Sequence, residues 1–401
     1  MTTGQDASAR TEHRADATIP GPRTGHPPEV TVLRDPAAFA ALADEWQALH
    51  RRCAAATAFQ THAWLHSWWL SYGRPGRLRV VLVRRGGVLV GAAALTVRYR
   101  GVPVWVPVGA GISDYADVLV DPADPGNTAA LADALRTAAR GAVIDLREVR
   151  PGAAAERMYD AWRGPRRRLP DSVCLELPGR PMDDLIARVG SSSRGQRIRS
   201  NLRRLDAAGV TERDVPPDEV ASAVAEMLRL HLLQWQGRGV NPEHVRPRFR
   251  AHLTRACTLM AASGDAVVSE FTMGGEVVAA NLTVLSPALA GGYLYGAHPS
   301  LRGTKVDVTT LLMRHGVRHA AGGGREVLSL LRGAEPHKFH WRPEHVTNHR
   351  LLLAARPLTP VLHLRAALAQ GRTRLAARAR RHAPVLHAWR SRLNDWRATR
   401  P

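Results

Sequence analysis

Cysteine, lysine and long apolar runs are scarce in this chain of 401 residues. The three cysteines, Cys53, Cys174 and Cys257, are too few and too scattered for a disulfide framework or a cysteine-based zinc site. No stretch of about 18 uncharged apolar residues occurs, so no transmembrane helix is expected. The first 28 residues are polar and lack an apolar run of the secretory type. We therefore expect a disordered lead at 1–28 and a reduced, cytoplasmic setting.

Basic residues are abundant, but almost all of them are arginine. Only two lysines, Lys305 and Lys338, occur among 56 basic residues, and the formal net charge is +21. Residues 356–401 hold eleven arginines and one acid, so this tail carries nearly half of that charge. Its apolar residues recur at near-helical spacing: Leu364, Leu368, Leu375 and Ala379. The pattern predicts a basic amphipathic helix, which favours acidic membrane surfaces or nucleic acid; a solvated basic helix packed on the domain is the alternative.

Two glycine pairs, Gly86-Gly87 and Gly274-Gly275, each join two runs of strand-type residues. The first pair lies within 79–97 and the second within 266–284. A two-residue Gly-Gly loop predicts a β-hairpin, because primed turns need positive φ. The second strands of the two hairpins are similar, which indicates a duplicated domain.

The elements expected around the two hairpins follow one order: two helices, the hairpin, a strand, a helix and a short strand. Apolar stripes predict the paired helices: Phe39, Leu42, Trp46 and Leu49, then Trp64, Trp68 and Tyr72, in the first half; Leu228, Leu232 and Trp235, then Phe249, Leu253 and Met260, in the second. The later elements are expected at 104–108, 129–140 and 143–146, and at 293–295, 308–321 and 327–330. Gly141 and the run Gly322-Gly-Gly follow the later helices and predict left-handed C-caps.

These patterns predict an α/β fold with two lobes, a mixed sheet in each and a cleft between them. About two domains also fit the chain length. We place the N-terminal lobe at 29–177, the C-terminal lobe at 178–355 and a basic helical tail at 356–401. Trp64, Trp68 and Trp69 are expected in the core.

An arginine-rich helix is the first candidate site. Five arginines and no acid occur within eleven residues: Arg194, Arg197, Arg199, Arg203 and Arg204. Serines at 191–193 can cap this helix and Gly209 can end it. Guanidinium groups suit phosphate or carboxylate ligands; the alternative is an ordinary solvated face.

The second candidate is the loop before the helix expected at 308–321. It contains Arg302, Gly303, Thr304 and Lys305. A glycine-containing loop between a strand and a helix N-terminus favours anions, so Arg302 and Lys305 can hold a pyrophosphate. Alternatively Thr304 or Asp307 is a plain helix cap.

The third candidate follows the last predicted strand and contains Glu335, His337 and Lys338. Glu335 or His337 can act as a general base, and Lys338 can hold an anionic oxygen. A metal site is not expected, because His337 and His340 lack a second ligand pair at useful spacing. The alternative is a packed segment with Trp341 in the core.

The fourth candidate is the loop at 109–117, with Ser113, Asp114 and Tyr115. It can line a cleft. It can equally be a turn in which Ser113 and Asp114 bond to their own backbone.

Four segments in this order resemble a known family: Phe59-Gln60-Thr-His-Ala-Trp64, the 113–117 loop, the arginine helix and Gly333-x-Glu335-x-x-Lys338-x-x-Trp341. Over about residues 30–345 the chain resembles GNAT-superfamily acyltransferases of the CelD-like, cellulose-biosynthesis group, which are relatives of Fem-type aminoacyl ligases. The resemblance implies two GNAT-like lobes. It also implies transfer of an acyl group, such as acetyl from acetyl-CoA, to an amine or hydroxyl in polysaccharide or cell-envelope synthesis.

Within this resemblance, the second lobe is expected to hold the acyl-CoA through Arg302, Gly303, Thr304 and Lys305, although the family's glycine pattern is not reproduced there. Glu335 is expected to deprotonate the acceptor and Lys338 to position an anionic group, with no metal. His337 stands where a tyrosine is usual. The acceptor is expected in the cleft near six residues: Asp114, Tyr115, Arg194, Arg199, Arg203 and Trp235.

Two alternatives remain open. A Fem-like, aminoacyl-tRNA-dependent ligase would use the arginine helix and the tail on RNA phosphates. A non-catalytic assembly protein of an exopolysaccharide system would use the tail to dock on an acidic membrane or glycan at the inner face of the membrane.

Overall fold

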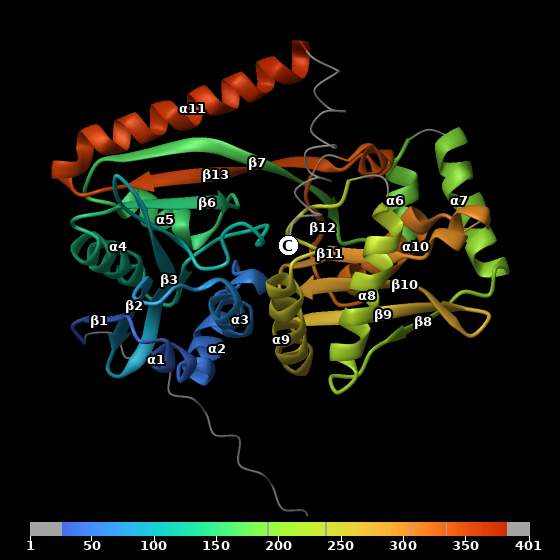
Figure 1. The fold of residues 1–401 in the computed structure, drawn as a ribbon, viewed down its shortest axis with the longest axis horizontal. Coiled ribbons are helices and arrows are strands. Elements are labelled where there is room, and N and C mark those ends of the chain that lie inside the picture. Colours follow the sequence, from blue (N-terminus) through green and yellow to red (C-terminus); the bar gives the residue numbers. More distant parts are fainter. Residues whose placement is uncertain (1–25, 191, 237–238, 305, 334, 383–401) are drawn as a thin grey trace, which may run out of the picture.

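The computed structural model describes residues 26–190, 192–236, 239–304, 306–333 and 335–382. Across these ranges thirteen strands form one mixed sheet, and the chain builds two halves side by side (Figure 1). The mixed α/β architecture that the sequence predicts is confirmed. None of the described helices is long and apolar enough to cross a membrane.

The first half runs from β1 to β7. Its elements are β1 (Glu29–Leu33), α1 (Pro36–Ala40), α2 (Ala43–Arg52), α3 (His62–Tyr72), β2 (Leu78–Arg85), β3 (Val88–Arg100), β4 (Val102–Pro107), β5 (Leu119–Val120), α4 (Gly126–Ala138), β6 (Val143–Val149), α5 (Ala154–Ala161) and β7 (Arg166–Pro178).

The second half repeats this order, and a long helix follows it. Its elements are α6 (Met182–Arg188), α7 (Ser192–Ala207), β8 (Thr211–Asp214), α8 (Val220–Trp235), α9 (Pro247–Ser263), β9 (Ala266–Met273), β10 (Glu276–Leu285), β11 (Leu289–Ala297), α10 (Val308–Ala321), β12 (Val327–Arg332), β13 (Glu344–Leu353) and α11 (Thr359–His382).

Both glycine pairs form the expected hairpin turns. Gly86 and Gly87 have φ of 54° and 79°, and Gly274 and Gly275 have φ of 61° and 86°. These values suit a type I′ turn, whose twist matches the flanking strands. The left-handed cap expected at Gly141 is wrong, because α4 ends at Ala138 and its cap residue is Ala139, with φ of −100°. In the run Gly322-Gly-Gly the expected left-handed residue is present: Gly324 has φ of 65°, whereas Gly322 has φ of −66°.

The two halves exchange their last strands. The sheet order is β1-β2-β3-β4-β6-β13-β7-β12-β11-β10-β9-β8, with β5 paired to β3. Strand β13, from the second half, pairs with β6 of the first, and β7 of the first half pairs with β12 of the second. The separate sheets expected for the lobes are therefore joined into one, because β7 and β13 pair with each other along most of their length.

Side chains of the sheet pack against helices on both faces. In β2, Val80 and Leu82 belong to a core that includes residues of α2, α3, α8 and α9, whereas Val81 and Val83 pack with α4 and α5. This alternation follows from the two-residue repeat of a strand. Trp64, Trp68 and Trp69 are buried as expected.

Helices α3 and α9 hold the halves together at the centre of the molecule (Figure 1). The rings of Trp64 and His252 meet edge to face with centroids 4.5 Å apart. The Tyr72 hydroxyl donates to Glu243 at 3.0 Å. Packing and polar contacts thus reinforce the joined sheet.

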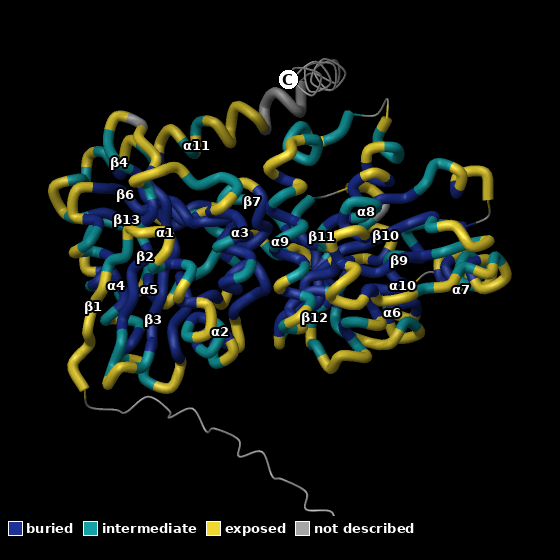
Figure 2. The backbone as a smooth tube through the Cα atoms, turned by 60° about the horizontal axis from the view of Figure 1, so that its bottom comes forward, coloured by how far each residue is buried: buried dark blue, intermediate teal, exposed yellow. Residues whose placement is uncertain are grey.

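Helix α11 lies over β7 and β13 of the first half (Figure 1). Its inner face buries Leu362 and Ala366. The leucines of the predicted stripe lie outside this packed face: Leu364, Leu368 and Leu375 are 60%, 53% and 68% exposed. Figure 2 shows exposed stretches along α11. The predicted basic helix is present, but its leucine stripe is a surface feature. The side chain of Ala379 lies outside the described residues.

Candidate functional site

A cluster of charged side chains lies where the two halves meet. Arg332, at the end of β12, places its guanidinium 3.2 Å from a carboxylate oxygen of Asp114 and 3.0 Å from one of Glu148. Asp114 belongs to the loop after β4 and Glu148 to β6, so three separate elements supply the cluster. Both carboxylates are largely buried, with side chains 13% and 10% exposed.

Local distortions in two related strands place Glu148 and Arg332. Strands β6 and β12 occupy the same position in the two halves, and the pairing of each is irregular near its end. Glu148 and Leu331 have φ of 59° and 53°, an unusual conformation for residues other than glycine. Such strained bulges redirect side chains and gather at functional sites.

A second layer of polar contacts surrounds the cluster. The Tyr115 hydroxyl donates to Glu176 at 3.0 Å and lies 2.9 Å from the Ser329 hydroxyl. Arg150 donates two hydrogen bonds of 2.9 Å to Glu176. The Asn348 amide donates to the backbone carbonyl of Asp114 at 3.3 Å. These contacts fix the 113–117 loop against both halves.

Burial raises the pKa of Asp114 to about 6, although the Arg332 guanidinium opposes the shift. Asp117 also has a pKa raised to about 6 by burial. Its oxygens, however, accept backbone N–H groups of Ala154 and Ala155 at the start of α5. Asp117 therefore caps a helix, whereas Asp114 has a pKa suited to a general base near neutral pH.

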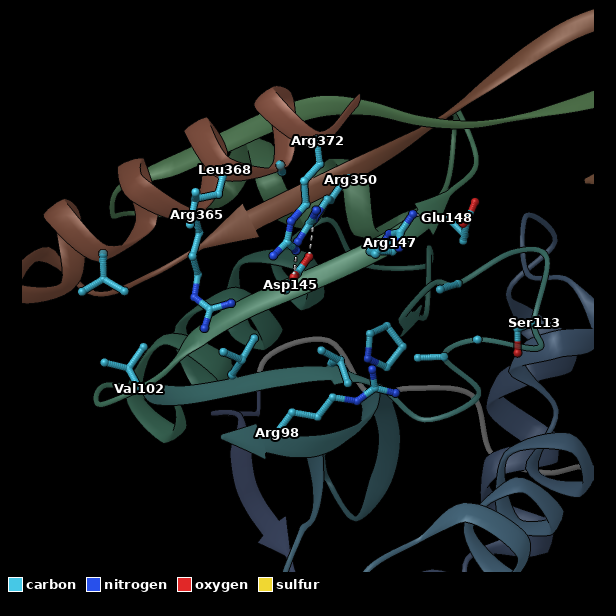
Figure 3. A pocket seen from close by; sticks show the side chains of 18 of the residues that line it. Arg98, Val102, Ser113, Asp145, Arg147, Glu148, Arg350, Arg365, Leu368 and Arg372 are labelled. Atoms are coloured by element: carbon cyan, nitrogen blue, oxygen red, sulfur yellow. Dashed lines mark hydrogen bonds and ion pairs between the residues drawn. The ribbon is translucent and has the colours of Figure 1, made fainter. Parts of the chain in front are cut away.

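A cavity of about 600 Å³ opens beside this cluster, between α11 and the strands β4 and β6 (Figure 3). Strands β4 and β6 pair only at Val104 and Trp105, and the cavity lies where they diverge. Its inner wall includes Ser113, Glu148 and Arg332, so it leads to the Asp114 cluster.

The cavity wall is strongly basic and partly apolar. Six arginines line it against two acids, Asp145 and Glu148; the arginines are Arg98, Arg147, Arg332, Arg350, Arg365 and Arg372. In Figure 3, Arg365 and Arg372 extend from α11 toward β6, and Arg98 faces them. Arg350 is bound in a bidentate ion pair to Asp145 at 2.7 and 2.6 Å. Arginine side chains thus supply most of the polar part of the wall, and guanidinium groups suit phosphate or carboxylate ligands.

The closing segment lies next to the cluster. The Lys338 ammonium is 2.8 Å from a Glu335 oxygen and 3.4 Å from each of the backbone carbonyls of Arg332 and Gly333. The Glu335 side chain is 47% exposed. Trp341 is buried, as the alternative for this segment expected. The side chain of His337 lies outside the described residues.

The second predicted anion site forms a separate group at the start of α10. Arg302, in the short helix Pro299–Gly303, donates to the Gln234 carbonyl at 2.8 Å. Thr304 closes its own turn through the Leu301 carbonyl, and Asp307 caps α10, as the simpler alternative predicts. Lys305 lies outside the described residues. Trp235 ends α8 directly after Gln234 and is half-buried.

The arginine helix α7 belongs to this second group. Arg194, Arg199 and Arg203 are exposed on it. The Asn201 amide donates to Asp307 at 3.3 Å, which places α7 beside the first turn of α10. Figure 1 shows α7 at the outer end of the second half, away from the junction. The predicted site residues thus divide between the Asp114 cluster and the start of α10.

Sequence patterns missed the other members of the Asp114 cluster: Glu148, Arg150, Glu176, Arg332 and Asn348. One signal was available, because ionisable residues interrupt apolar strands at 143–149 and 327–332. Buried charges in such strands require partners. The pattern does not say which charges pair across the two halves.

Comparisons with known proteins agree with this architecture. Residues 192–339 match the family model described as an acetyltransferase (GNAT) domain. Among curated proteins no match was found.

Three solved structures share the fold over most of their length. FemX is 12% identical, with a TM-score of 0.57 over 80% of this chain and 98% of its own. A conserved protein from Bacteroides thetaiotaomicron is 11% identical, with a TM-score of 0.54 over 81% and 100%. L-PGS from Bacillus licheniformis is 13% identical, with a TM-score of 0.50 over 83% and 96%. At these identities the likeness concerns the fold, and within it residues 192–339 are similar to GNAT-type acetyltransferase domains.

Proposed function

We propose that this protein transfers an acyl group, such as acetyl, from a CoA thioester to an amine or hydroxyl of an acceptor bound in the cavity beneath α11. The observation that carries the proposal is the position of Asp114. It contacts Arg332, which lines the inner end of that cavity, and its pKa is raised to about 6. A carboxylate with such a pKa accepts a proton efficiently near neutral pH.

Asp114 is the general base in this proposal. Its carboxylate takes the proton from the acceptor as the acceptor nitrogen or oxygen attacks the thioester carbonyl, and the CoA thiolate leaves. Arg332 orients the carboxylate through its 3.2 Å contact. Asp114 replaces Glu335 in this role, because Glu335 is nearly half exposed and ion-paired with Lys338. Binding both reactants at the junction supplies the proximity that such a transfer needs.

The donor is assigned to the second half. Strands β11 and β12 pair only from Leu289 to Gly291, so they diverge toward the Asp114 cluster. Beyond β11 lie Arg302, Gly303 and Thr304, the first turn of α10 and the arginines of α7. Helix N-termini and guanidinium groups both favour phosphate, which matches the anionic part of CoA.

The acceptor is assigned to an acidic, partly apolar class. The cavity combines six arginines with apolar residues such as Val104 and Leu368. A phosphorylated or carboxylated precursor of a polysaccharide or of the cell envelope has this character. Guanidinium groups can bind the phosphate or carboxylate of such a precursor through paired hydrogen bonds.

Titration with acetyl-CoA and measurement of CoA release test the proposal. We expect acetyl-CoA binding by the wild type, and CoA release that increases with acidic amine or hydroxyl acceptors. Asp114→Asn should bind acetyl-CoA normally and lower kcat by about 10²–10⁴-fold, the range for loss of a general base. Glu335→Gln is the matched control and should retain most of the activity. A folded protein that binds no acyl-CoA contradicts the proposal.

A Fem-like, aminoacyl-tRNA-dependent transfer is the second candidate. It is favoured by α7, which exposes arginines beside the donor loop and can meet RNA phosphates. Sharing a fold with FemX is compatible with it. Binding to tRNA that persists at about 200 mM salt, together with no binding of acetyl-CoA, would favour this candidate over the first.

We further propose that α11 docks the enzyme on an acidic membrane surface, on the cytoplasmic side. The helix exposes Leu364, Leu368 and Leu375, of which Leu364 and Leu368 also line the cavity, and arginines alternate with these leucines. Apolar side chains with basic neighbours are typical of helices that lie in the interface of anionic membranes. This position would bring the cavity beneath α11 close to membrane-associated acceptors.

A further inference from the structure

Four potential metal ligands converge at the edge of the second half. They belong neither to the Asp114 cluster nor to the group at the first turn of α10. Glu212 and Asp214 lie on the edge strand β8, and His315 and His319 lie on α10. One ligand atom from each of the four lies within 4.8 Å of all the others. The spacing explains the convergence, because i and i+2 share a face of a strand and i and i+4 share a face of a helix.

We propose that Glu212, Asp214, His315 and His319 form a binding site for a divalent transition-metal ion, with Zn²⁺ as the best match. Two imidazole nitrogens and two carboxylate oxygens are a ligand set that Zn²⁺ accepts in tetrahedral geometry. Donors about 2.0–2.1 Å from zinc lie about 3.3 Å apart. The most distant of the four atoms must therefore approach each other by up to about 1.5 Å, and His315 Nδ1 and the Glu212 oxygen, 2.5 Å apart, must separate by slightly less than about 1 Å, both of which side-chain rotations can supply.

Outer hydrogen bonds already orient two of the ligands. The Ser269 hydroxyl donates to Asp214 at 2.6 Å. His315 has its Nε2 3.0 Å from the Thr283 hydroxyl, which in turn accepts from Asn281. When His315 donates from Nε2, the lone pair of Nδ1 points at Glu212, 2.5 Å away. A cation that binds both acceptors satisfies them. Hydrogen-bonding partners behind the ligands, such as Ser269 and Thr283, are typical of metal sites.

Arg318 is the competitor for this position. Its guanidinium lies 2.9 Å from Glu212 and 2.6 Å from Asp214. The Arg318 side chain is 47% exposed, so it can move into solvent. One arginine against two carboxylates leaves one negative charge uncompensated, whereas a divalent ion neutralises both. Metal binding therefore displaces Arg318 and ties β8 directly to α10.

The test uses the tag-free full chain after removal of metal with EDTA. Calorimetric titration with Zn²⁺ should give one site per chain, and the same sample loaded with Co²⁺ should show the visible absorption of tetrahedral cobalt. His319→Ala should weaken zinc binding by more than about 100-fold, beyond the 10–100-fold cost of losing an outer-shell partner. His363→Ala, which removes an exposed histidine of α11, is the control and should bind as the wild type does.

Arg318→Gln distinguishes a metal site from an ion-pair network. In a metal site this variant should bind Zn²⁺ more tightly than the wild type, because the competing cation is gone, and Zn²⁺ should restore any loss in its thermal midpoint. In a simple ion-pair network it should lose stability, and Zn²⁺ should restore none of it. That second result, or unchanged zinc binding in His319→Ala, overturns the proposal. Failure of acetyl-CoA binding would not affect it.

Discussion

Asp114 combines two properties that oppose each other in a folded protein. Its carboxyl is buried, which disfavours the charged form, and it lies 3.2 Å from Arg332, which favours that form. Burial is the larger effect, since the pKa is raised to about 6. Keeping this group costs stability at neutral pH, and the proposed transfer reaction supplies a reason for retaining it.

The raised pKa predicts how Asp114 affects stability as the pH changes. In the unfolded chain an aspartate ionises near 3.9, whereas folded Asp114 keeps its proton up to about pH 6. The folded state therefore binds more protons between these values. The free energy of unfolding contributed by Asp114 is fully present below about pH 4 and is lost as the pH rises through 6, by about 3 kcal/mol.

Urea unfolding at several pH values checks this prediction. Between pH 4 and pH 7, the stability of the wild type should fall relative to that of Asp114→Asn, whose amide does not titrate. The broken contact with Arg332 adds an offset that is the same at every pH at which Arg332 is charged. A constant difference between the two proteins across this range would show that Asp114 has an ordinary pKa.

At the residue scale, the sequence indicated the members of the site that lie in loops. Asp114 and Tyr115 were placed at a cleft by one of two open interpretations of the 109–117 loop, together with the family resemblance. Glu148 and Arg332 were not expected at the site, because they meet only through two strand bulges with positive φ, at Glu148 and Leu331. No propensity predicts such strained conformations, which exist only where the surrounding structure imposes them.

Helix α11 has two apolar faces with different roles. Leu362 and Ala366 pack on the sheet, and this contact anchors the helix. Leu364, Leu368 and Leu375 remain exposed, and leucines in water are unfavourable unless a partner covers them. A membrane interface can cover them without disturbing the packed face.

Replacing the three exposed leucines by serine should weaken binding to anionic lipid vesicles by at least about tenfold, because each buried leucine side chain contributes about 1.5–3 kcal/mol. Co-sedimentation with vesicles containing phosphatidylglycerol measures the effect. Leu259→Ser, which changes an exposed leucine of α9, is the control. Equal binding by the triple variant and the wild type would remove α11 from the membrane proposal.

At the element scale, local chemistry predicted most of the second half well. The helix expected at 308–321 is α10 at the same bounds, and Gly274-Gly275 makes the expected turn. Within the three consecutive glycines at 322–324 the left-handed residue is Gly324, a position that the sequence did not single out. Local sequence therefore determined the element but not its last turn.

At the scale of the whole molecule, the strand exchange makes the halves interdependent. Strand β13 completes the first half, and β7 completes the second. The duplication was visible in the sequence, but the exchange was not. An apolar strand such as 351–353 satisfies either sheet equally well, and only the three-dimensional path of the chain decides between them.

Two truncations test this interdependence. A chain that ends at Pro343 lacks β13 and α11, so β6 and much of β7 lose a strand partner and the buried Leu351, Leu352 and Leu353 are gone. We expect it to aggregate or to unfold without cooperativity, because unpaired strand edges in a sheet centre recruit other chains. A chain that ends at Ala355 keeps β13 and is the matched control. It should unfold in one cooperative transition in urea, at a lower midpoint than the full chain, because the side chains beneath α11 are uncovered. If the chain ending at Pro343 unfolds as cooperatively as this control, the lobes are independent domains and the exchanged strands contribute only a surface contact.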